Sequence, residues 1–281
     1  MRKAAFDQLV LKHGVSKASR LSGFTKSSYY YRPVQQHADR RKPRLDLAVL
    51  RAIENEVMEH PSYGVRRVTA MLCRRGMFAS RKKVYRLMKL ANLVRKASVR
   101  KHAIVKRFMT VPERPDHLWQ QDITYIWCGQ DGWGYLFSIL DCFTREWLAY
   151  TFSTQCGTGE AIRTLEIAIL DRFSDGTIPA GLTIRNDGGS QYTSARFISA
   201  LKVYDIRHEV TGKNRPDQNA YIEAFHRSIK EDCIWQHEFQ TFQEADAVIG
   251  QFFYEYNWDR PHSSLKYMTP KEFYAAYGGT G

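Results

Sequence analysis

The chain has 281 residues, of which 43% are hydrophobic and 13% are aromatic. This composition excludes an intrinsically disordered protein and leaves room for about two domains. Its 42 Lys and Arg outnumber 29 Asp and Glu, which gives a net charge of +13. The apolar stretches are far shorter than the about 20 residues of a transmembrane helix, and no signal peptide is recognisable. The five cysteines are scattered and contain no C-x-x-C pair, which favours a cytoplasmic protein with reduced thiols over the secreted, membrane and disulfide-rich classes.

The charge differs in sign between the two parts of the chain. Residues 1–115 carry 28 Lys and Arg against 7 Asp and Glu, a net +21, whereas residues 116–281 carry 14 against 22, a net −8. Residues 60–112 contain fifteen basic residues and no acid. Because such rows neutralise phosphates, the basic part predicts a nucleic-acid partner, with a solvated basic face or a membrane-surface helix as alternatives. Carboxylates gathered around metal ions would explain the acidic part.

The start of the chain predicts short helices and a linker. A first helix ends at Gly14, a second spans about residues 16–21, and a third covers about residues 27–31. Residues 32–44 form a polar linker that contains two prolines. We therefore expect residues 1–40 to comprise a short helical segment of helix-turn-helix type and linker.

Residues 45–105 predict a basic DNA-binding domain. Apolar spacing indicates one helix that stops before Pro61, a second that ends at Gly76, and a third capped by Ser80. The first helix is amphipathic, with spaced residues Leu47, Leu50, Ile53, Glu54 and Val57. The third faces inward with Val84, Leu87 and Met88, and its basic residues on the other side are Arg81, Lys82, Lys83, Arg86 and Lys89. Together with Arg66 and Arg67, they indicate a helix-turn-helix that enters the major groove of DNA. An ordinary three-helix bundle with a basic surface is the alternative. A basic tether follows.

The pattern then changes to alternating strands and helices. We expect strands at 117–127, 135–142, 146–152, 182–186 and 206–210, and helices at 159–173, 194–203, 217–235 and 242–257. Three successive strands followed by alternating helices and strands are typical of an α/β fold, with a mixed sheet and helices on its faces.

Three acids in this part have positions that can converge. Asp122 lies inside an otherwise apolar strand, where a carboxylate is costly unless it is paired or binds a metal. Asp187 ends a strand at the edge where α/β sheets place their ligands. Glu223 lies at the margin of the apolar stripe of a helix, and Lys230 follows two turns later on nearly the same face.

Converging carboxylates suit hard divalent cations such as Mg²⁺ or Mn²⁺. Two such ions would clamp the attacking and leaving oxygens of a displacement at phosphorus, with Lys230 holding a phosphate. From spacing alone, Asp141 could replace Asp122, and Glu231 or Asp232 could replace Glu223.

The motifs around these acids resemble those of a known family. The segments Gln121–Tyr125, Asn186–Ser194 and Arg215–Phe225 look like those of the integrase-core transposases of bacterial insertion sequences, in the DDE superfamily of retroviral integrases. Thirty-five residues separate Asp187 from Glu223, the spacing typical of this group. The run from Tyr256 to His262, which contains Arg260-Pro261-His262, also resembles the family; its role stays open. More narrowly, the chain resembles the second-frame (OrfB-type) product of two-frame insertion sequences.

The resemblance implies an RNase H-like mixed five-stranded sheet in a catalytic core of residues 113–236, with a C-terminal helical extension at 237–281. It implies Asp122, Asp187 and Glu223 as catalytic ligands of two Mg²⁺ or Mn²⁺ ions, and Lys230 as a DNA contact. Asn219 and Gln191 are candidates for lining the site. No zinc is expected, because the His and Cys residues lack zinc-site spacing.

The implied function is DNA transposition by strand cleavage at the element ends and transfer of the 3′-OH. The implied partners are double-stranded DNA, an upstream-frame helix-turn-helix protein or frameshift fusion, and further copies of this chain, in a bacterial, nucleoid-associated setting without a membrane. A nuclease of the same fold that cuts without joining and an inactive DNA-binding regulator are the rivals. A tyrosine recombinase that uses Tyr29, Tyr30 or Tyr31 lacks the Arg and His residues such a site needs.

Overall fold

The computed structural model describes residues 2–30, 46–95, 109–212 and 216–278. The predicted linker at 32–44 and most of the predicted tether therefore lie outside the described residues, as does Arg215 of the third motif. The chain divides into two units, residues 1–46 and residues 47–281.

The first unit contains two helices, α1 (Arg2–Ser22) and α2 (Lys26–Tyr30). The backbone of α1 breaks at Gly14, where φ is +76°, so the predicted end of the first helix is confirmed. Phe6 is buried, and its ring lies 4.8 Å from that of Phe24 and 5.2 Å from that of Tyr29. Tyr29 thus packs in the small core of this unit.

The second unit begins with the three predicted helices, α4 (Leu47–Glu59), α5 (Val65–Arg74) and α6 (Arg81–Leu90). Ser80 caps α6, since its side chain accepts a hydrogen bond from the Lys83 N–H. The buried face of α4 consists of Val49, Ile53 and Glu56. Ile53 of the predicted face is buried, and Leu50 and Val57 pack against the same core. Leu47 and Glu54 of the predicted face are exposed instead.

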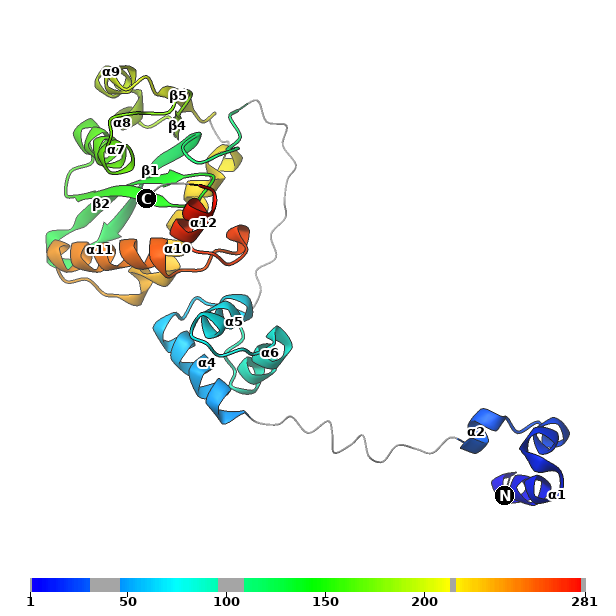
Figure 1. The fold of residues 1–281 in the computed structure, drawn as a ribbon. Coiled ribbons are helices and arrows are strands. Elements are labelled where there is room, and N and C mark those ends of the chain that lie inside the picture. Colours follow the sequence, from blue (N-terminus) through cyan, green and yellow to red (C-terminus); the bar gives the residue numbers. More distant parts are fainter. Residues whose placement is uncertain (1, 31–45, 96–108, 213–215, 279–281) are drawn as a thin grey trace. The chain divides into compact units, whose positions relative to one another are not determined.

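The rest of the second unit is built on a five-stranded mixed sheet in the order β3-β2-β1-β4-β5. Its strands are β1 (Leu118–Trp127), β2 (Trp133–Asp141), β3 (Trp147–Ser153), β4 (Thr183–Asn186) and β5 (Arg207–Val210). The first three form an antiparallel meander. β4 and β5 run parallel to β1. The carboxyl ends of β4 and β5 therefore point the same way as that of β1, and β4 lies beside β1 (Figure 1).

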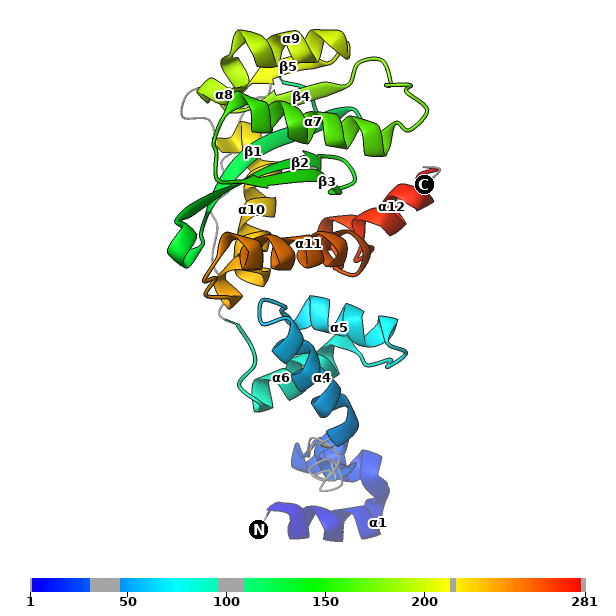
Figure 2. The same ribbon diagram turned by 90° about the vertical axis from the view of Figure 1, so that its left-hand side faces the viewer.

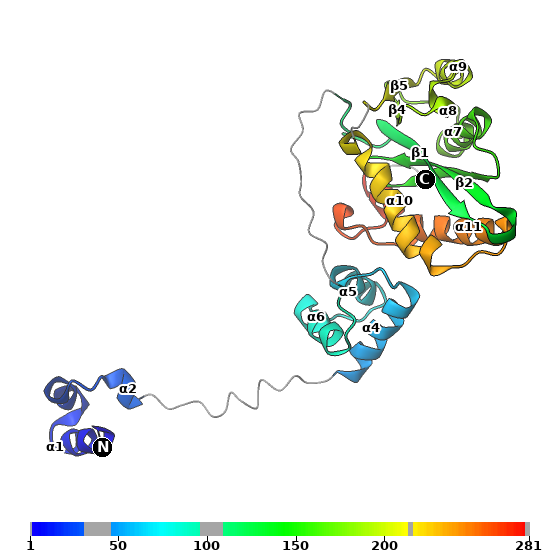
Figure 3. The ribbon, with the colours of Figure 1, turned by 180° about the vertical axis from the view of Figure 1, so that it is seen from behind.

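Helices cover both faces of this sheet (Figure 2). On one face, α7 (Thr158–Arg172) and α9 (Ala195–Val203) enclose a core around Trp119, Phe137 and Leu165. On the other face, α10 (Ala220–Asp232) and α11 (Phe242–Trp258) enclose a core around Trp147, Phe225 and Phe252. Figure 3 shows α10 running past β1 on the side opposite α7. The predicted α/β fold with a mixed sheet is confirmed.

Some helix limits differ from those predicted. The helix expected at 217–235 is shortened to α10, with the 3-10 turns η2 (Pro216–Asn219) and η3 (Ile234–Gln236) at its two ends. Four short elements were not predicted individually: α8 (Ser190–Thr193), the 3-10 turns η1 (Gly129–Asp131) and η4 (Ser263–Leu265), and α12 (Pro270–Ala276). α12 begins with a capping box between Thr269 and Glu272. Among the described residues, no helix has the length and apolarity needed to cross a membrane.

Candidate active site

The register of two parallel strands brings Asp122 and Asp187 together. The last pair of the β1–β4 ladder is Gln120 with Arg185. One residue further along, the Asn186 side chain donates a hydrogen bond to the Gln121 carbonyl at 3.3 Å. Asp122, which is still within β1, and Asp187, which is the first residue after β4, come next, so they lie at the same level of the sheet.

A buried glutamine holds the helix that carries Glu223 against the same strand. The Gln120 side-chain oxygen accepts a hydrogen bond from the Ile222 N–H at 2.9 Å, and its amide donates to the Gln218 carbonyl at 2.9 Å. The Gln218 carbonyl also accepts from Arg185 at 3.1 Å. Because Ile222 immediately precedes Glu223, these bonds fix the start of α10 beside β1.

The electrostatics of Asp122 show that these acids interact. Burial, and then the carboxylates of Asp187 and Glu223, raise the pKa of Asp122 to about 7 in total, although a hydrogen bond from the Ile123 N–H and the charge of Lys230 act in the opposite direction. The two other acids and Lys230 therefore all lie within electrostatic range of Asp122. Like charges this close favour a bound cation.

The loop after β4 is shaped around Asp187. Its carboxylate accepts a hydrogen bond from the Gly189 N–H at 3.0 Å. A Cβ atom at Gly189 would lie 2.9 Å from that carboxylate and 2.7 Å from the Gln191 side-chain oxygen. The Gln191 amide lies 3.4 Å from the Cys156 sulfur. Asn219, at the start of α10, is buried, and its side-chain oxygen has no hydrogen-bond partner among the described residues.

Two further side chains at this site were not predicted. The Nδ1 atom of His226 lies 3.5 Å from Asp122 Oδ2. Burial and then Lys230 lower the pKa of His226 to about 3, so its ring is neutral. Its place one helical turn after Glu223 was a usable signal. Tyr192 is buried, and burial, followed by the charges of Asp122 and Asp187, raises the pKa of its hydroxyl. Nothing in its sequence position predicted that it lies near these acids.

The acids considered as replacements are occupied elsewhere. The Asp141 carboxylate accepts hydrogen bonds from the backbone N–H groups of Asp116 at 2.7 Å and Thr144 at 2.7 Å. Asp232 forms an ion pair with Arg260 at 2.7 Å, and Glu231 lies 3.4 Å from Arg95.

The Arg260-Pro261-His262 motif is part of the interior. Arg260 is only 2% exposed, and its guanidinium also faces the ring of Tyr256, 5.5 Å away. Burial, and then the charge of Arg260, lower the pKa of His262 well below its usual value. The ion pair between Arg260 and Asp232, the last residue of α10, thus fixes the chain just after α11.

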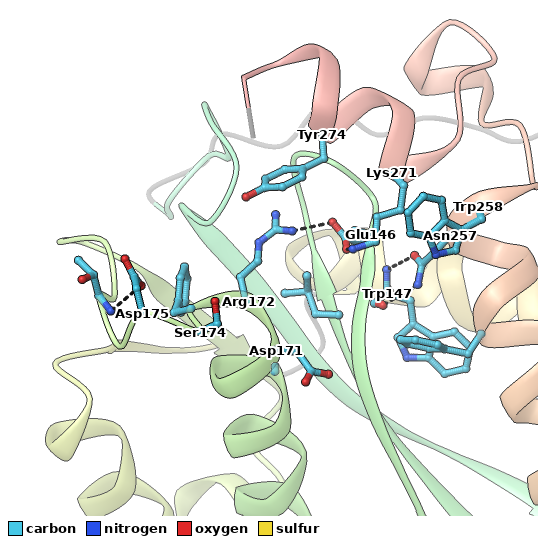
Figure 4. A pocket seen from close by; sticks show the side chains of 15 residues that line it. Glu146, Trp147, Asp171, Arg172, Ser174, Asp175, Asn257, Trp258, Lys271 and Tyr274 are labelled. Carbon is cyan, nitrogen blue, oxygen red and sulfur yellow. Dashed lines mark hydrogen bonds and ion pairs between the residues drawn. The ribbon is translucent and has the colours of Figure 1, made fainter. Parts of the chain in front are cut away.

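A second group of carboxylates, here called the Arg172 cluster, comprises Asp116, Asp141, Glu146, Arg172 and Lys271. It borders a cavity of about 700 Å³ between α7 and the α11–α12 region. Figure 4 shows Arg172 directed at Glu146, with the Tyr274 ring beside its guanidinium. Arg172 lies 3.0 Å from Asp116 and 2.8 Å from Glu146, and Lys271 also pairs with Glu146 at 2.5 Å.

A third group, Glu56, Glu59 and His60, has ligand atoms close enough to hold a metal. Arg75 binds both carboxylates, each at 2.7 Å. His60 pairs with Glu255 at 3.2 Å. The three side chains therefore already have partners of opposite charge.

The basic side chains of α5 and α6 differ in how far they are exposed to solvent. On α6, Arg81, Lys82, Arg86 and Lys89 are exposed, and Lys83 is partly exposed. Arg66 on α5 is exposed too. Arg67 is half-buried, with its guanidinium 5.4 Å from the ring of Tyr63, and burial lowers the pKa of Arg67.

Family comparisons agree with this architecture. Two matches to the family described as "Integrase core domain" cover residues 112–216 and 204–270. A match to the family described as "HTH-like domain" covers residues 44–102. A chain of the simian T-cell lymphotropic virus intasome in complex with PP2A regulatory subunit B56 gamma has a similar fold, with a TM-score of 0.51 and 18% identity over 82% of this chain and 75% of that chain.

Two curated relatives cover most of the sequence. The "Transposase for insertion sequence element IS904" of Lactococcus lactis is 30% identical over 224 residues, which are 75% of this chain and 87% of the relative. The "Insertion element IS407 uncharacterized 31.7 kDa protein" of Burkholderia multivorans is 28% identical over 266 residues, 94% of this chain and 91% of the relative. The chain therefore belongs to the integrase-core transposases of insertion sequences, and its function is DNA transposition.

Proposed function

We propose that Asp122, Asp187 and Glu223 are the catalytic acids of this transposase and hold two Mg²⁺ or Mn²⁺ ions. The observation that carries the proposal is the placement of the three acids: the β1–β4 register puts Asp122 and Asp187 at one level, and the hydrogen bonds of Gln120 hold the start of α10, which carries Glu223, against β1. These acids come from β1, from the end of β4 and from α10, yet they act on one another. Carboxylate oxygens are the ligands that hard divalent cations prefer.

The proposed reaction is phosphoryl transfer without a covalent enzyme intermediate. Two bound divalent ions supply activation of the attacking oxygen and stabilisation of the leaving oxygen. In the first step, water breaks a phosphodiester bond at the element end and leaves a 3′-OH. In the second, that 3′-OH forms a new phosphodiester bond with the target strand and displaces the target's own 3′ oxygen, which leaves with a proton.

The surrounding side chains have positioning roles in this proposal. Lys230 holds a phosphate of the bound strand beside the carboxylates. The neutral ring of His226 lies against Asp122 without adding a charge. Gln191 and Asn219 line the site, where the buried side-chain oxygen of Asn219 has no hydrogen-bond donor among the described residues.

We further propose that residues 45–105 bind the element ends through the exposed basic residues of α6 and Arg66, and that Arg67 supports this domain from within. Residues 1–40 comprise a short N-terminal helical segment and the linker that follows it, 113–236 are the catalytic core and 237–281 its C-terminal extension. Because both element ends must be held together, the active form is a dimer or larger assembly on DNA. An upstream-frame protein or frameshift fusion completes it, in the bacterial cytoplasm.

The test uses the purified chain, alone and fused to its upstream frame, with DNA that carries the ends of its own element. Cleavage and joining products are measured with Mg²⁺, with Mn²⁺ and with EDTA. We expect Asp122→Asn, Asp187→Asn and Glu223→Gln each to reduce both products on the order of 10³-fold or more. The matched control Glu166→Gln changes an exposed acid on α7 and should leave both products unchanged.

The other outcomes separate the rival functions. Full activity in any one of the three variants would remove that residue from the catalytic set. Metal-dependent cleavage without joining, in the fused form as well, would indicate a nuclease. Tight DNA binding with neither product in both forms would indicate a DNA-binding regulator.

A further inference from the structure

Four large aromatic side chains are exposed beside the candidate active site. Tyr125 and Trp127 on β1 are each 55% exposed, Trp133 on β2 is 53% exposed, and Trp235 in η3 is 66% exposed. With Lys230 they line a cavity of about 720 Å³, whose floor includes the buried residues Ile126, Ile234 and Phe239. We call this cavity the aromatic groove. Its volume lies within the about 300–1,000 Å³ usual for ligand pockets.

The groove follows from the short pairing of β1 with β4. β4 pairs with β1 only over Leu118–Gln120, whereas β2 pairs with β1 as far as Trp127. In the described residues, this edge of β1 therefore has no neighbouring strand beyond the level of Asp122. The edge opens at the carboxylates, and the aromatic residues lie further along the same strand.

The walls of the groove are fixed in place. The turn between β1 and β2 is attached to the segment before α11, because the Gln130 N–H donates to the Gln240 carbonyl at 3.0 Å and the Phe242 N–H donates to Asp131 at 2.7 Å. Gly129 adopts a φ of +52°, and a Cβ atom there would lie 2.7 Å from the Gln240 carbonyl oxygen. The two walls thus approach each other too closely for any residue but glycine at this position.

The groove lies next to the catalytic acids along two elements. Tyr125 lines it three residues after Asp122 on β1, and Lys230 lines it two helical turns after Glu223 on α10. Lys230 also lowers the pKa of Asp122. Burial raises the pKa of Tyr125, and the charges of Asp187 and Asp122 raise it further. A nucleic-acid strand bound at the carboxylates can therefore enter the groove past Lys230. Glu238 is a carboxylate in the lining, and it lies next in sequence to His237, another lining residue.

We propose that the aromatic groove binds unpaired nucleobases of the DNA strand that is cut at the carboxylates. This inference rests on the proposed function of Asp122, Asp187 and Glu223. The faces of bases inside a duplex are covered by their neighbours, so only unpaired nucleotides can stack on Trp127, Trp133 or Trp235. Such stacking accepts every base, while Lys230 holds the backbone. The groove thus favours an element end whose last base pairs are opened.

The test measures binding without cleavage, in EDTA. Three labelled probes are compared by fluorescence anisotropy: a blunt duplex, the same duplex with a short unpaired tail, and the tailed duplex with abasic sites in the tail. The wild-type chain should prefer the tail that carries bases. We expect Trp235→Ala and Trp127→Ala each to weaken binding of the tailed duplex by about 5- to 150-fold, which corresponds to about 1–3 kcal/mol per stacked base.

Three controls keep this result interpretable. Binding of the blunt duplex should stay unchanged in both variants, which also reports that they are folded. Trp235→Phe should retain most of the preference for the tail, because a ring face remains. The matched variant Tyr254→Ala removes a 61% exposed aromatic residue from α11, outside the groove, and should have no effect.

Two results would overturn the inference. The first is equal wild-type affinity for the tailed and abasic probes. The second is unchanged tail binding in Trp235→Ala and Trp127→Ala, and a change in oligomeric state in those variants would then assign the groove to contacts between copies. The proposed catalytic function fails separately, if Asp122→Asn still cleaves DNA while the groove variants lose tail binding.

Discussion

Two groups of carboxylates in the same domain have opposite surroundings. In the Arg172 cluster, Asp116 and Glu146 lie within 3.0 Å and 2.8 Å of one buried arginine. Those carboxylates, together with a hydrogen bond to Asp116, raise the pKa of Arg172 despite its burial. At the candidate active site, Lys230 is the cation that acts on Asp122, and its effect is outweighed by burial and by two other carboxylates.

The difference separates acids that stabilise the fold from acids available for chemistry. A buried carboxylate is tolerated when arginine and hydrogen bonds compensate for its lost hydration. Where that compensation is incomplete, the site binds a cation or a proton more readily. Both groups contain three aspartates or glutamates, so the number of acids does not distinguish them. The buried arginine that lies within hydrogen-bond distance of Asp116 and Glu146 distinguishes these two acids from Asp122, whose pKa is raised by burial.

The largest expected effect comes from breaking the paired cluster. Arg172→Met should lower the free energy of unfolding by about 3–5 kcal/mol, because Asp116 and Glu146 would remain buried without their cation. Urea denaturation at pH 7 measures this change. Arg163→Met, an exposed arginine on the same helix, is the matched control and should shift stability by less than about 0.5 kcal/mol. Equal effects of the two variants would contradict the role given to Arg172.

An intermediate effect concerns the pH dependence of Asp141. Burial, and then the nearby Asp116 carboxylate, raise the pKa of Asp141 from 3.8 to about 6. The folded chain therefore holds this proton more tightly than the unfolded chain. The resulting stability is present below about pH 4 and is lost as the pH rises through about 6.

The comparison of wild type with Asp141→Asn tests this sign. Between pH 4 and pH 7, wild-type stability should fall by about 3 kcal/mol relative to the variant, since each unit of pKa corresponds to about 1.4 kcal/mol. The pH dependence is decisive rather than the absolute stability, because asparagine also alters the bond to the Asp116 N–H. A constant difference across this range would show that Asp141 does not titrate there.

The smallest expected effect on stability concerns the carboxylates of the candidate active site. Asp122→Asn should raise the free energy of unfolding by about 1 kcal/mol at pH 8 in EDTA, because it removes one of three repelling charges, and catalytic residues often reduce stability in this way. Thermal unfolding measures the gain. Asp246→Asn, at an exposed position of α11, serves as control. A loss of stability would place Asp122 among the acids that hold the fold together.

Much of the domain structure could be predicted from local pattern. The alternation of apolar residues in β1, the Ser80 cap of α6 and the break at Gly14 depend on neighbours in sequence. The face of α4 was predicted less well, because the helices that pack against it decide which of its apolar residues are buried. The limits of α10 were missed for a similar reason, since the hydrogen bonds of Gln120 hold its start.

The sequence alone determined which acids deserved attention, through the motifs around Asp122, Asp187 and Glu223. It could not decide which acids are paired with a buried arginine, because Arg172 is 56 residues from Asp116 in the chain and Arg260 is 28 residues from Asp232. Only the tertiary structure revealed the aromatic groove, where strand pairing ends early and distant aromatic residues share one cavity. Local pattern follows from short-range geometry, whereas compensation of charge and exposure of rings depend on contacts between distant segments.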